Sequence, residues 1–437
     1  MFGYYLNLAL RSLKRNPILT ALMVLAIGLG IGASMTMITV LHVMSGDPLP
    51  GRSAQLYRPY LNPLPLNHKK SSFGPDPSIN LTWPDAMALL DAHHAVRQAA
   101  MAGGTLLVWP QRSDLQPFYV DGRYATPDFF AMFGVPFVAG AGWNSEDEQA
   151  AAHVIVLAQS LARKLFGNDA VMGKTVRLGD ISYRVIGVTA DWAPKPLFYA
   201  DASASFYSDA DQFFLPLSVA VDNKLQINGN VSGWGSDAAP NNWTDASTSW
   251  IQFWVQLDSP VQVAAYQQFL VDYSAEQKSL GRFQRPPTDA KLYSLMGWLA
   301  HENLVPDDVK LQMWLALGFL GVAMLNIVAL LLAKFLRRSG EISVRRAMGA
   351  RKRDIFVQFG IESALIGVAG GLLGLGISQI GLWSIRQRPD DYAHLAQMDP
   401  SMLIGTVALA TIASVLAGML PAWRACRVPP ALQLKTL

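Results

Sequence analysis

Cysteine and charged residues are scarce in this sequence. The single cysteine, Cys426, excludes an internal disulfide, so any exported domain must be stabilised by its packed core alone. Only 15% of the 437 residues are charged, whereas 51% are hydrophobic. Soluble proteins carry about 25% charged residues, so the composition indicates an integral membrane protein with one large water-facing part. The net charge of +3 is too small to indicate nucleic acid binding.

Four apolar segments are long enough to cross a bilayer, which requires about 20 residues in a helix. They cover residues 18–44, 311–336, 355–385 and 402–423. The first contains no Lys, Arg, Asp or Glu, is too long for a removable signal peptide, and lacks the small-residue cleavage pattern. We therefore interpret it as a permanent anchor.

Basic residues gather before the first span, between the second and third, and after the fourth. Because Lys and Arg are retained on the cytoplasmic side, and four crossings bring these three places to one side, both termini are expected in the cytoplasm. The remaining segments follow: residues 1–17 as a cytoplasmic amphipathic helix, 45–310 as an extracytoplasmic domain, 337–354 as a cytoplasmic loop, 386–401 as a short extracytoplasmic loop, and 424–437 as a cytoplasmic tail.

The segment 45–310 mixes helix and strand signals, which predicts an α+β domain, in two lobes. Thr82 is a candidate N-cap of a helix, and alternating residues around Gly179 predict a hairpin. A strand pattern is broken at Pro260 and followed by a helix pattern. Residues 193–248 show little regular pattern, so we expect a loop-bearing insertion suited to partner contacts.

No catalytic or metal-binding motif is complete. The Gly-Lys-Thr tripeptide at 173–175 invites a phosphate-loop interpretation, but Asn168 stands where that loop needs glycine. His301 begins a zinc-protease pattern, but Val305 occupies the place of the second histidine. We therefore expect neither catalysis, nor a metal, nor a cofactor bound by this chain.

Small and polar residues mark the spans. Glycines recur at four-residue spacing, which lets helix backbones approach closely in lipid, either within one chain or at a seam between two copies. A structural ion pair is expected for Glu362, near the basic loop. The glycines are Gly28, Gly32, Gly367, Gly370, Gly371 and Gly374.

The loop 337–354 contains the stretch GEISVRRAMGARKRDIF, which begins at Gly340. Apolar residues stand among its cations, and glycines stand near both ends, so we predict a short surface helix that ends at Gly349. Retention of positive charge alone would not require the apolar residues or the glycine. We therefore hypothesise that this helix docks into a groove on a cytoplasmic partner.

This stretch resembles the coupling segment of permeases in the MacB/FtsX family of ABC transporters, where a Glu-Ile-x-x-Arg-Arg-Ala-x-Gly-Ala run precedes a helix. Three further stretches resemble parts of this family. The family's amphipathic start is similar to LALRSLKRNP, its extracytoplasmic domain to residues 154–188, and its C-terminal ending to PAWRACRVPPALQLK. The resemblance implies that the following residues contact an ATPase partner: Glu341, Ile342, Arg345, Arg346, Ala347, Met348, Gly349 and Ala350.

The resemblance also implies a function and a location in the bacterial inner membrane, so that the segments 45–310 and 386–401 are expected to be periplasmic. MacB carries its ATPase on the same chain, whereas this sequence contains none, so a stand-alone permease is expected, with ATP and magnesium bound by a separate ATPase subunit. The permease would pair with a second copy or a sibling, transmit ATP-driven motion to its periplasmic domain (mechanotransmission) and serve export or efflux with a periplasmic adaptor and an outer-membrane duct. The alternatives are an FtsX-like activator of a cell-wall hydrolase and LolC/LolE-like lipoprotein extraction.

Overall fold

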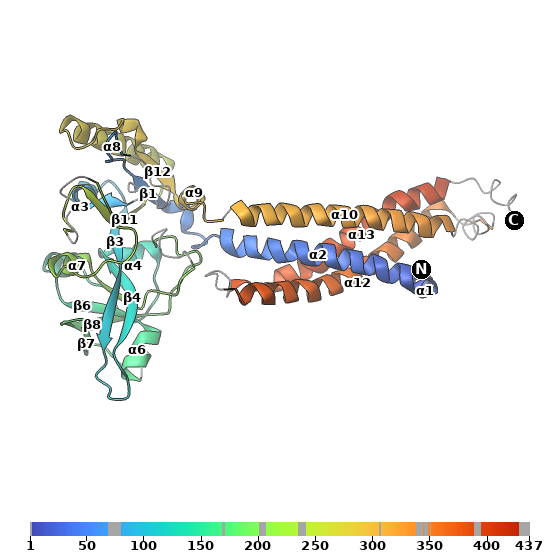
Figure 1. Cartoon of the computed structure of the whole chain (residues 1–437), viewed down its shortest axis with the longest axis horizontal. Helices are drawn as coiled ribbons and strands as arrows, with labels where there is room; N and C mark the ends of the chain where they lie inside the picture. The colour runs from blue at the N-terminus through green and yellow to red at the C-terminus, as the bar shows by residue number, and fades with distance from the viewer. Residues whose placement is uncertain are drawn as a thin grey trace. The chain divides into compact units, whose positions relative to one another are not determined.

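The computed structural model forms two compact units, which we call the helical unit (Met1–Ser45 with Val305–Leu437) and the sheet unit (Gly46–Leu304) (Figure 1). Four long apolar helices lie in the first, and the mixed α/β unit is inserted between the first and second of them. This confirms the predicted fold class. The structure describes residues 2–68, 80–167, 171–200, 207–234, 242–305, 307–337, 344, 348–349, 351–388 and 395–427.

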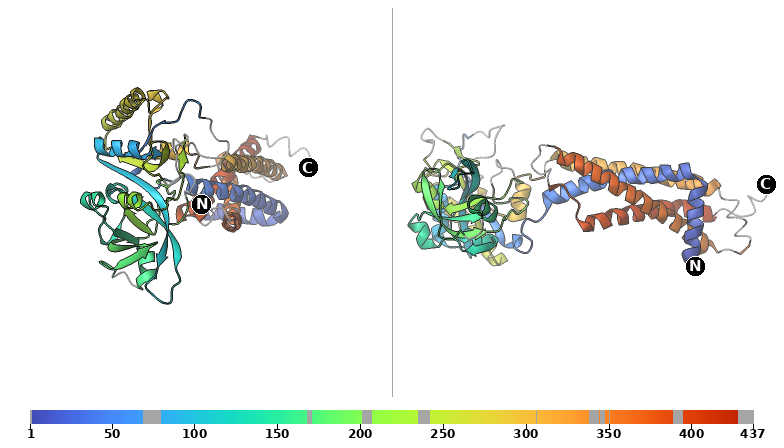
Figure 2. Two further views of the ribbon diagram at one scale, coloured as in Figure 1. Left: turned by 60° about the vertical axis from the view of Figure 1, so that its left-hand side comes forward. Right: turned by 90° about the horizontal axis from the view of Figure 1, so that it is seen from below.

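The helical unit begins with α1 (Phe2–Arg15), which lies at a steep angle to the long helices (Figure 2). Asn16 separates it from α2, and a proline at the first position of α2 suits a helix start, where the backbone N–H has no partner to lose. Within the described ranges, four helices have the length and composition to cross a membrane: α2 (Pro17–Ser45), α10 (Asp307–Arg337), α12 (Lys352–Arg386) and α13 (Pro400–Arg427).

The sheet unit has twelve described strands and several short helices. The strands are β1 (Leu56–Tyr60), β2 (Leu81–Thr82), β3 (Arg97–Trp109), β4 (Phe118–Ala125), β5 (Phe137–Gly140), β6 (Val154–Ala158), β7 (Thr175–Leu178), β8 (Ile181–Thr189), β9 (Phe213–Pro216), β10 (Ser232–Gly233), β11 (Thr248–Gln256) and β12 (Lys291–Ser294). The helices are α3 (Trp83–Ala92), α4 (Asp128–Phe133), α5 (Ser145–Gln149), α6 (Gln159–Phe166), α7 (Leu217–Asp222), α8 (Pro260–Ser279) and α9 (Leu295–His301).

Nine of the described strands join in one hydrogen-bonded path, in the order β12-β1-β11-β3-β4-β9-β6-β8-β5, while β2 and β10 pair with β11, and β7 pairs with β3 and β8. Most neighbours are antiparallel, but β4 with β9 and β6 with β8 are parallel, so the sheet is mixed. The long strand β3 pairs with β11, β4 and β7 and lies at the centre. A division into two lobes stays a prediction.

Three local predictions in the sheet unit are confirmed. The Thr82 hydroxyl accepts a hydrogen bond from the Asp85 amide at 3.3 Å and caps α3. The strands β7 and β8 pair as a hairpin through the turn at Gly179. Pro260 is the first residue of α8, and the Ser259 side chain caps that helix.

The segment 193–248 is more than the predicted insertion. It contributes β9, whose four residues are all buried and which lies between β4 and β6. A side chain at Gly122 would place its Cβ 2.4 Å from Phe213, so only glycine lets β9 approach β4 this closely. Arg123 also forms a buried ion pair with Asp211 at 2.8 Å. A four-residue run buried on both faces shows no alternation, so the sequence pattern did not predict β9. The insertion itself stays a prediction.

Candidate coupling site

Among the described residues of the helical unit, two charged side chains are fully buried. Lys334, in the last turn of α10, forms an ion pair with Glu362 of α12, and their exposed fractions are 1% and 0%. The Ser12 hydroxyl of α1 donates a hydrogen bond to the same carboxylate oxygen, Oε1, at 2.5 Å. One carboxylate therefore connects three helices, and we call these three residues the ion cluster.

The ion cluster constrains the helices energetically. A charge inside a membrane protein is expensive to bury unless it is paired, and removal of one partner from a buried pair costs about 3–5 kcal/mol. Rotation of α10 about its axis would separate Lys334 from Glu362 and incur that cost. The pair thus holds α10 and α12 in one register.

The ion cluster confirms the prediction of an ion pair for Glu362 but changes its expected location. The partner Lys334 lies within α10, three residues before the loop 337–354 begins. Sequence reasoning missed Lys334 and Ser12 as site residues. A lysine next to a run of basic residues looks like one more retained charge, and a serine in an amphipathic helix carries no distinctive signal.

Most of the predicted coupling residues lie outside the described residues: Glu341, Ile342, Arg345, Arg346, Ala347 and Ala350. Met348 is described; its amide donates to the Val344 carbonyl at 3.0 Å, a helical spacing, and 76% of its surface is exposed. Gly349 has φ +99°, a conformation that favours glycine. The docking role of these residues stays a prediction.

Four of the predicted glycines lie where α2 meets α12. A Cβ added to Gly370 would lie 2.5 Å from Ile27 Cγ2, and one added to Gly32 would lie 2.7 Å from Ile377 Cγ2. Such distances leave no room for a side chain, so the two backbones approach as closely as small-residue motifs allow. The predicted glycines at this seam are Gly28, Gly32, Gly370 and Gly374.

The other two predicted glycines lie where α12 meets α13. A Cβ on Gly367 would be 2.7 Å from the Thr411 Cα, and one on Gly371 would be 3.1 Å from the Val407 Cα. All six glycines thus pack at seams inside the chain, which is one of the two roles expected for them. As a consequence, α12 is tightly packed against helices on both sides.

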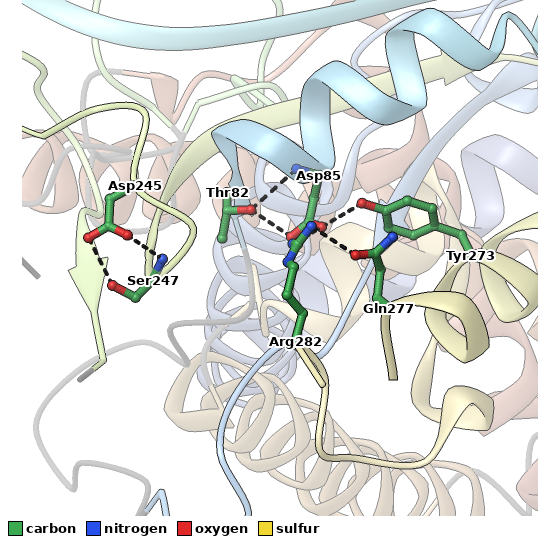
Figure 3. Close-up of polar contacts among 7 residues, drawn as sticks. All are labelled: Thr82, Asp85, Asp245, Ser247, Tyr273, Gln277 and Arg282. Atoms are coloured by element: carbon green, nitrogen blue, oxygen red, sulfur yellow. Dashed lines mark hydrogen bonds and ion pairs between the residues drawn. The ribbon is translucent and has the colours of Figure 1, made fainter. Parts of the chain in front are cut away.

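A second buried polar cluster lies in the sheet unit and joins α3 to α8 (Figure 3). The Asp85 carboxylate forms an ion pair with Arg282 and accepts a hydrogen bond from the Tyr273 hydroxyl at 2.7 Å. Burial, with a smaller effect of the Asp85 charge, raises the pKa of Tyr273 well above its usual range, so this hydroxyl stays protonated and donates at physiological pH. The cluster has the character of a structural clamp.

The residues of the incomplete phosphate-loop and zinc-protease motifs lie in ordinary turns and helices. The tripeptide at 173–175 forms the turn into β7. His301 ends α9 and stacks on Tyr293, with ring centroids 4.8 Å apart. Within the described ranges, no group of three or more His, Cys, Asp or Glu side chains could hold a metal ion.

Two protein families match this chain. Residues 20–273 match the MacB-like periplasmic core domain, and residues 313–430 match the FtsX-like permease C-terminal part. The pyoverdine export ATP-binding/permease protein PvdT of Pseudomonas entomophila is 26% identical, over 97% of this chain and 58% of PvdT. The macrolide export ATP-binding/permease protein MacB of Rhodospirillum rubrum is also 26% identical, over 99% of this chain and 60% of MacB.

The chain therefore spans about three fifths of the length of these curated relatives. Among solved structures, the periplasmic region of MacB from Actinobacillus actinomycetemcomitans is similar, with a TM-score of 0.37 and 16% identity. The match covers 56% of this chain and 92% of that region.

Proposed function

The chain belongs to the MacB/FtsX family of ABC transporter permeases, and from this membership we propose that it transmits the motion of an ATPase partner to its periplasmic domain. In this proposal the loop 337–354 and both termini are cytoplasmic. The loop receives the motion of the ATPase, and the helices carry it across the membrane. The chain itself hydrolyses no nucleotide and moves substrate by mechanotransmission.

The ion cluster is the observation that carries this proposal. The loop 337–354 is attached at one end to α10 and at the other to α12, and the pair Lys334–Glu362 connects these two helices next to it. A displacement of the loop therefore acts on two helices that are held in register. Without such a link, the motion would be absorbed as relative rotation of α10 and α12.

The glycine seams support the transfer of motion from α12 to the neighbouring helices. Because α12 packs closely on α2 and α13, a tilt of α12 meets steric resistance from its neighbours and moves them with it. The chain continues from α2 directly into the sheet unit and returns from it into α10. Both covalent connections to the sheet unit thus come from helices that take part in the motion.

A second permease copy is part of the proposal. Asn326 lies within the span α10 with its side chain exposed, on a face that also exposes Val322 and Leu325. An amide facing lipid has no hydrogen-bonding partner there, whereas polar side chains join helices across interfaces in membranes. We infer that this face of α10 contacts a second copy or a sibling permease.

The relatives' names suggest an export role. PvdT and MacB are both named as export proteins with ATP-binding and permease functions. Since their names specify different exported compounds, we propose efflux through a periplasmic adaptor and an outer-membrane duct without assigning a substrate.

The coupling role is tested by charge reversal in the loop. We expect Arg345→Glu combined with Arg346→Glu to abolish copurification of the ATPase with the full chain from native membranes, and to reduce the ATPase activity of the complex. The matched control is Arg11→Glu with Lys14→Glu, which reverses two exposed cations on α1 at the same membrane face. This control should retain both the ATPase and its activity.

Two outcomes would contradict the proposal. The loop would have no docking role if the loop variant kept the ATPase and its full activity. Equal loss from both double variants would indicate general electrostatic attraction rather than a defined contact.

A further inference from the structure

The sheet unit contains a cavity of about 350 Å³ whose wall carries two arginines. Four parts of the chain form it: the segment 51–56, the first residue of β3, one turn of α4 and the last residue of β11. Arg52 and Arg97 supply the charge, and Gln55 and Gln256 supply side-chain amides. Because these parts are far from one another in the sequence, the fold brings the four polar side chains together.

The accessible wall of this cavity is polar. The apolar side chains that line it, Leu56 and Met132, are each 1% exposed and present almost no surface to a ligand. An apolar ligand would gain little there, since its stabilisation depends on the apolar area removed from water. The arginines and amides instead offer N–H groups to a hydrophilic ligand with acceptor oxygens.

One hydrogen bond orients each guanidinium group. Arg52 Nη1 donates to the Ala131 carbonyl of α4 at 3.1 Å. Arg97 Nη1 donates to the Gln256 side-chain oxygen at 2.9 Å, and the amide of Gln256 donates in turn to Asp258 at 3.0 Å. Since a guanidinium group has five N–H donors, one bond fixes each group and leaves further donors for a ligand.

The two guanidinium charges lack a carboxylate partner among the described residues. Neither Arg52 nor Arg97 forms an ion pair within those ranges, and none of the described lining residues is acidic. Asp258 reaches Arg97 only through Gln256. Two like charges at one small cavity repel each other, and an anion between them would turn that repulsion into attraction.

We propose that this cavity binds a water-soluble phosphate, either inorganic phosphate or a phosphomonoester. Guanidinium groups bind phosphate oxygens in a bidentate manner. A phosphomonoester carries a charge of about −1.5 to −2 at pH 7, which matches two guanidinium groups, whereas a carboxylate would leave one of them uncompensated. The acyl chains of a phospholipid would find no apolar wall in the cavity. This inference does not depend on the ATPase coupling proposed above.

The bound phosphate would join two parts of the sheet unit. Arg52 lies in the segment that leads from α2 to β1, and Arg97 begins the central strand β3. A phosphate held by both side chains ties this segment to the strand. Amide hydrogen exchange in the segment 46–56 should therefore be slower when phosphate is bound.

Isothermal titration calorimetry of the full chain in phosphate-free detergent solution tests the proposal, with inorganic phosphate as the probe. We expect one site per chain and affinity about tenfold higher for phosphate than for acetate, because hydrogen bonds between charged groups contribute about that much. Arg52→Gln with Arg97→Gln should weaken phosphate binding about 100-fold, at about tenfold for each arginine. The matched control Arg177→Gln with Arg184→Gln removes two exposed arginines outside the cavity and should change binding by no more than about twofold.

Arg97→Gln alone, with an expected loss of about tenfold, keeps the test valid if the double variant misfolds, which size-exclusion chromatography would reveal. Glycerol 3-phosphate distinguishes the two sources: tighter binding than that of phosphate assigns the cavity to monoesters, and weaker binding assigns it to the free ion. The proposal is overturned if phosphate does not bind at millimolar concentration, if acetate binds equally well, or if both double variants weaken binding equally. Displacement of phosphate by phosphatidylglycerol in mixed micelles at equal concentration would also overturn it, in favour of a lipid headgroup.

Discussion

The Lys334–Glu362 pair gives the most demanding prediction for the helical unit. The two side chains are 1% and 0% exposed, so neither can reach water when its partner is removed. We expect Lys334→Met and Glu362→Leu each to lower the free energy of unfolding by about 3–5 kcal/mol, because each leaves one buried charge unpaired. The double variant leaves no charge behind, and it should lie within about 1 kcal/mol of the wild type.

Unfolding of the full chain in detergent micelles, followed by circular dichroism, measures these effects. Lys310→Met is the matched control because Lys310 lies on the same helix, α10, and pairs with Asp307 at 3.0 Å. That pair is largely exposed, so its loss should cost less than about 1 kcal/mol. A buried charge left unpaired is not the cause if the two single effects simply add in the double variant, or if Lys334→Met is as mild as Lys310→Met.

Further predictions concern packing, hydrogen bonding and pH. Gly370→Val should destabilise the helical unit by about 1–3 kcal/mol through its contact with α2. The control Gly376→Val should not, because a Cβ there meets nothing within 4 Å. Thermal unfolding in detergent measures both variants, and equal effects would contradict close packing of α2 on α12 at Gly370. Tyr273→Phe should lower the free energy of unfolding by about 1.5–3 kcal/mol, because it removes a hydrogen bond to the buried Asp85 carboxylate. The control Tyr119→Phe, at an exposed tyrosine, should leave stability unchanged. Equal denaturation midpoints for the two variants would count against a clamp at Asp85. Burial raises the pKa of Glu148 above its ordinary value, so the folded chain holds this proton more tightly than the unfolded chain, and stability should fall as pH rises above about 4.5. Glu148→Gln should flatten this part of a pH–stability curve, and an unchanged slope would disprove the assignment.

The sequence was sufficient to predict the elements with long or strongly patterned signals. The spans follow from apolar length alone, and the hairpin at Gly179 and the cap at Thr82 follow from local turn and capping chemistry. Such features depend on residues a few positions apart. The strand β9 was missed because its place between β4 and β6 depends on pairing with distant segments, and on Gly122 leaving space for it.

The candidate site was predictable only in part, for the same reason. Glu362 stood out because a carboxylate is rare in an apolar span. Its partners did not, since Ser12 is 350 positions away and Lys334 resembles the cations that follow it. Which face of one helix meets another is decided by packing, as the glycine seams illustrate, and periodicity does not identify the neighbour.

Positive charge has two distinct physical roles in this helical unit. The cations of the loop 337–354 follow the pattern of retention on one side of a membrane, and in the function proposed above Arg345 and Arg346 also contact the ATPase. A lysine in the last turn of a span would normally extend its flexible chain toward the interface and stay hydrated. Lys334 instead turns inward to Glu362, at a desolvation cost that retention alone would not require. We infer that this inward turn specifies which face of α10 meets α12, because every other rotation of α10 would leave Glu362 buried without its cation.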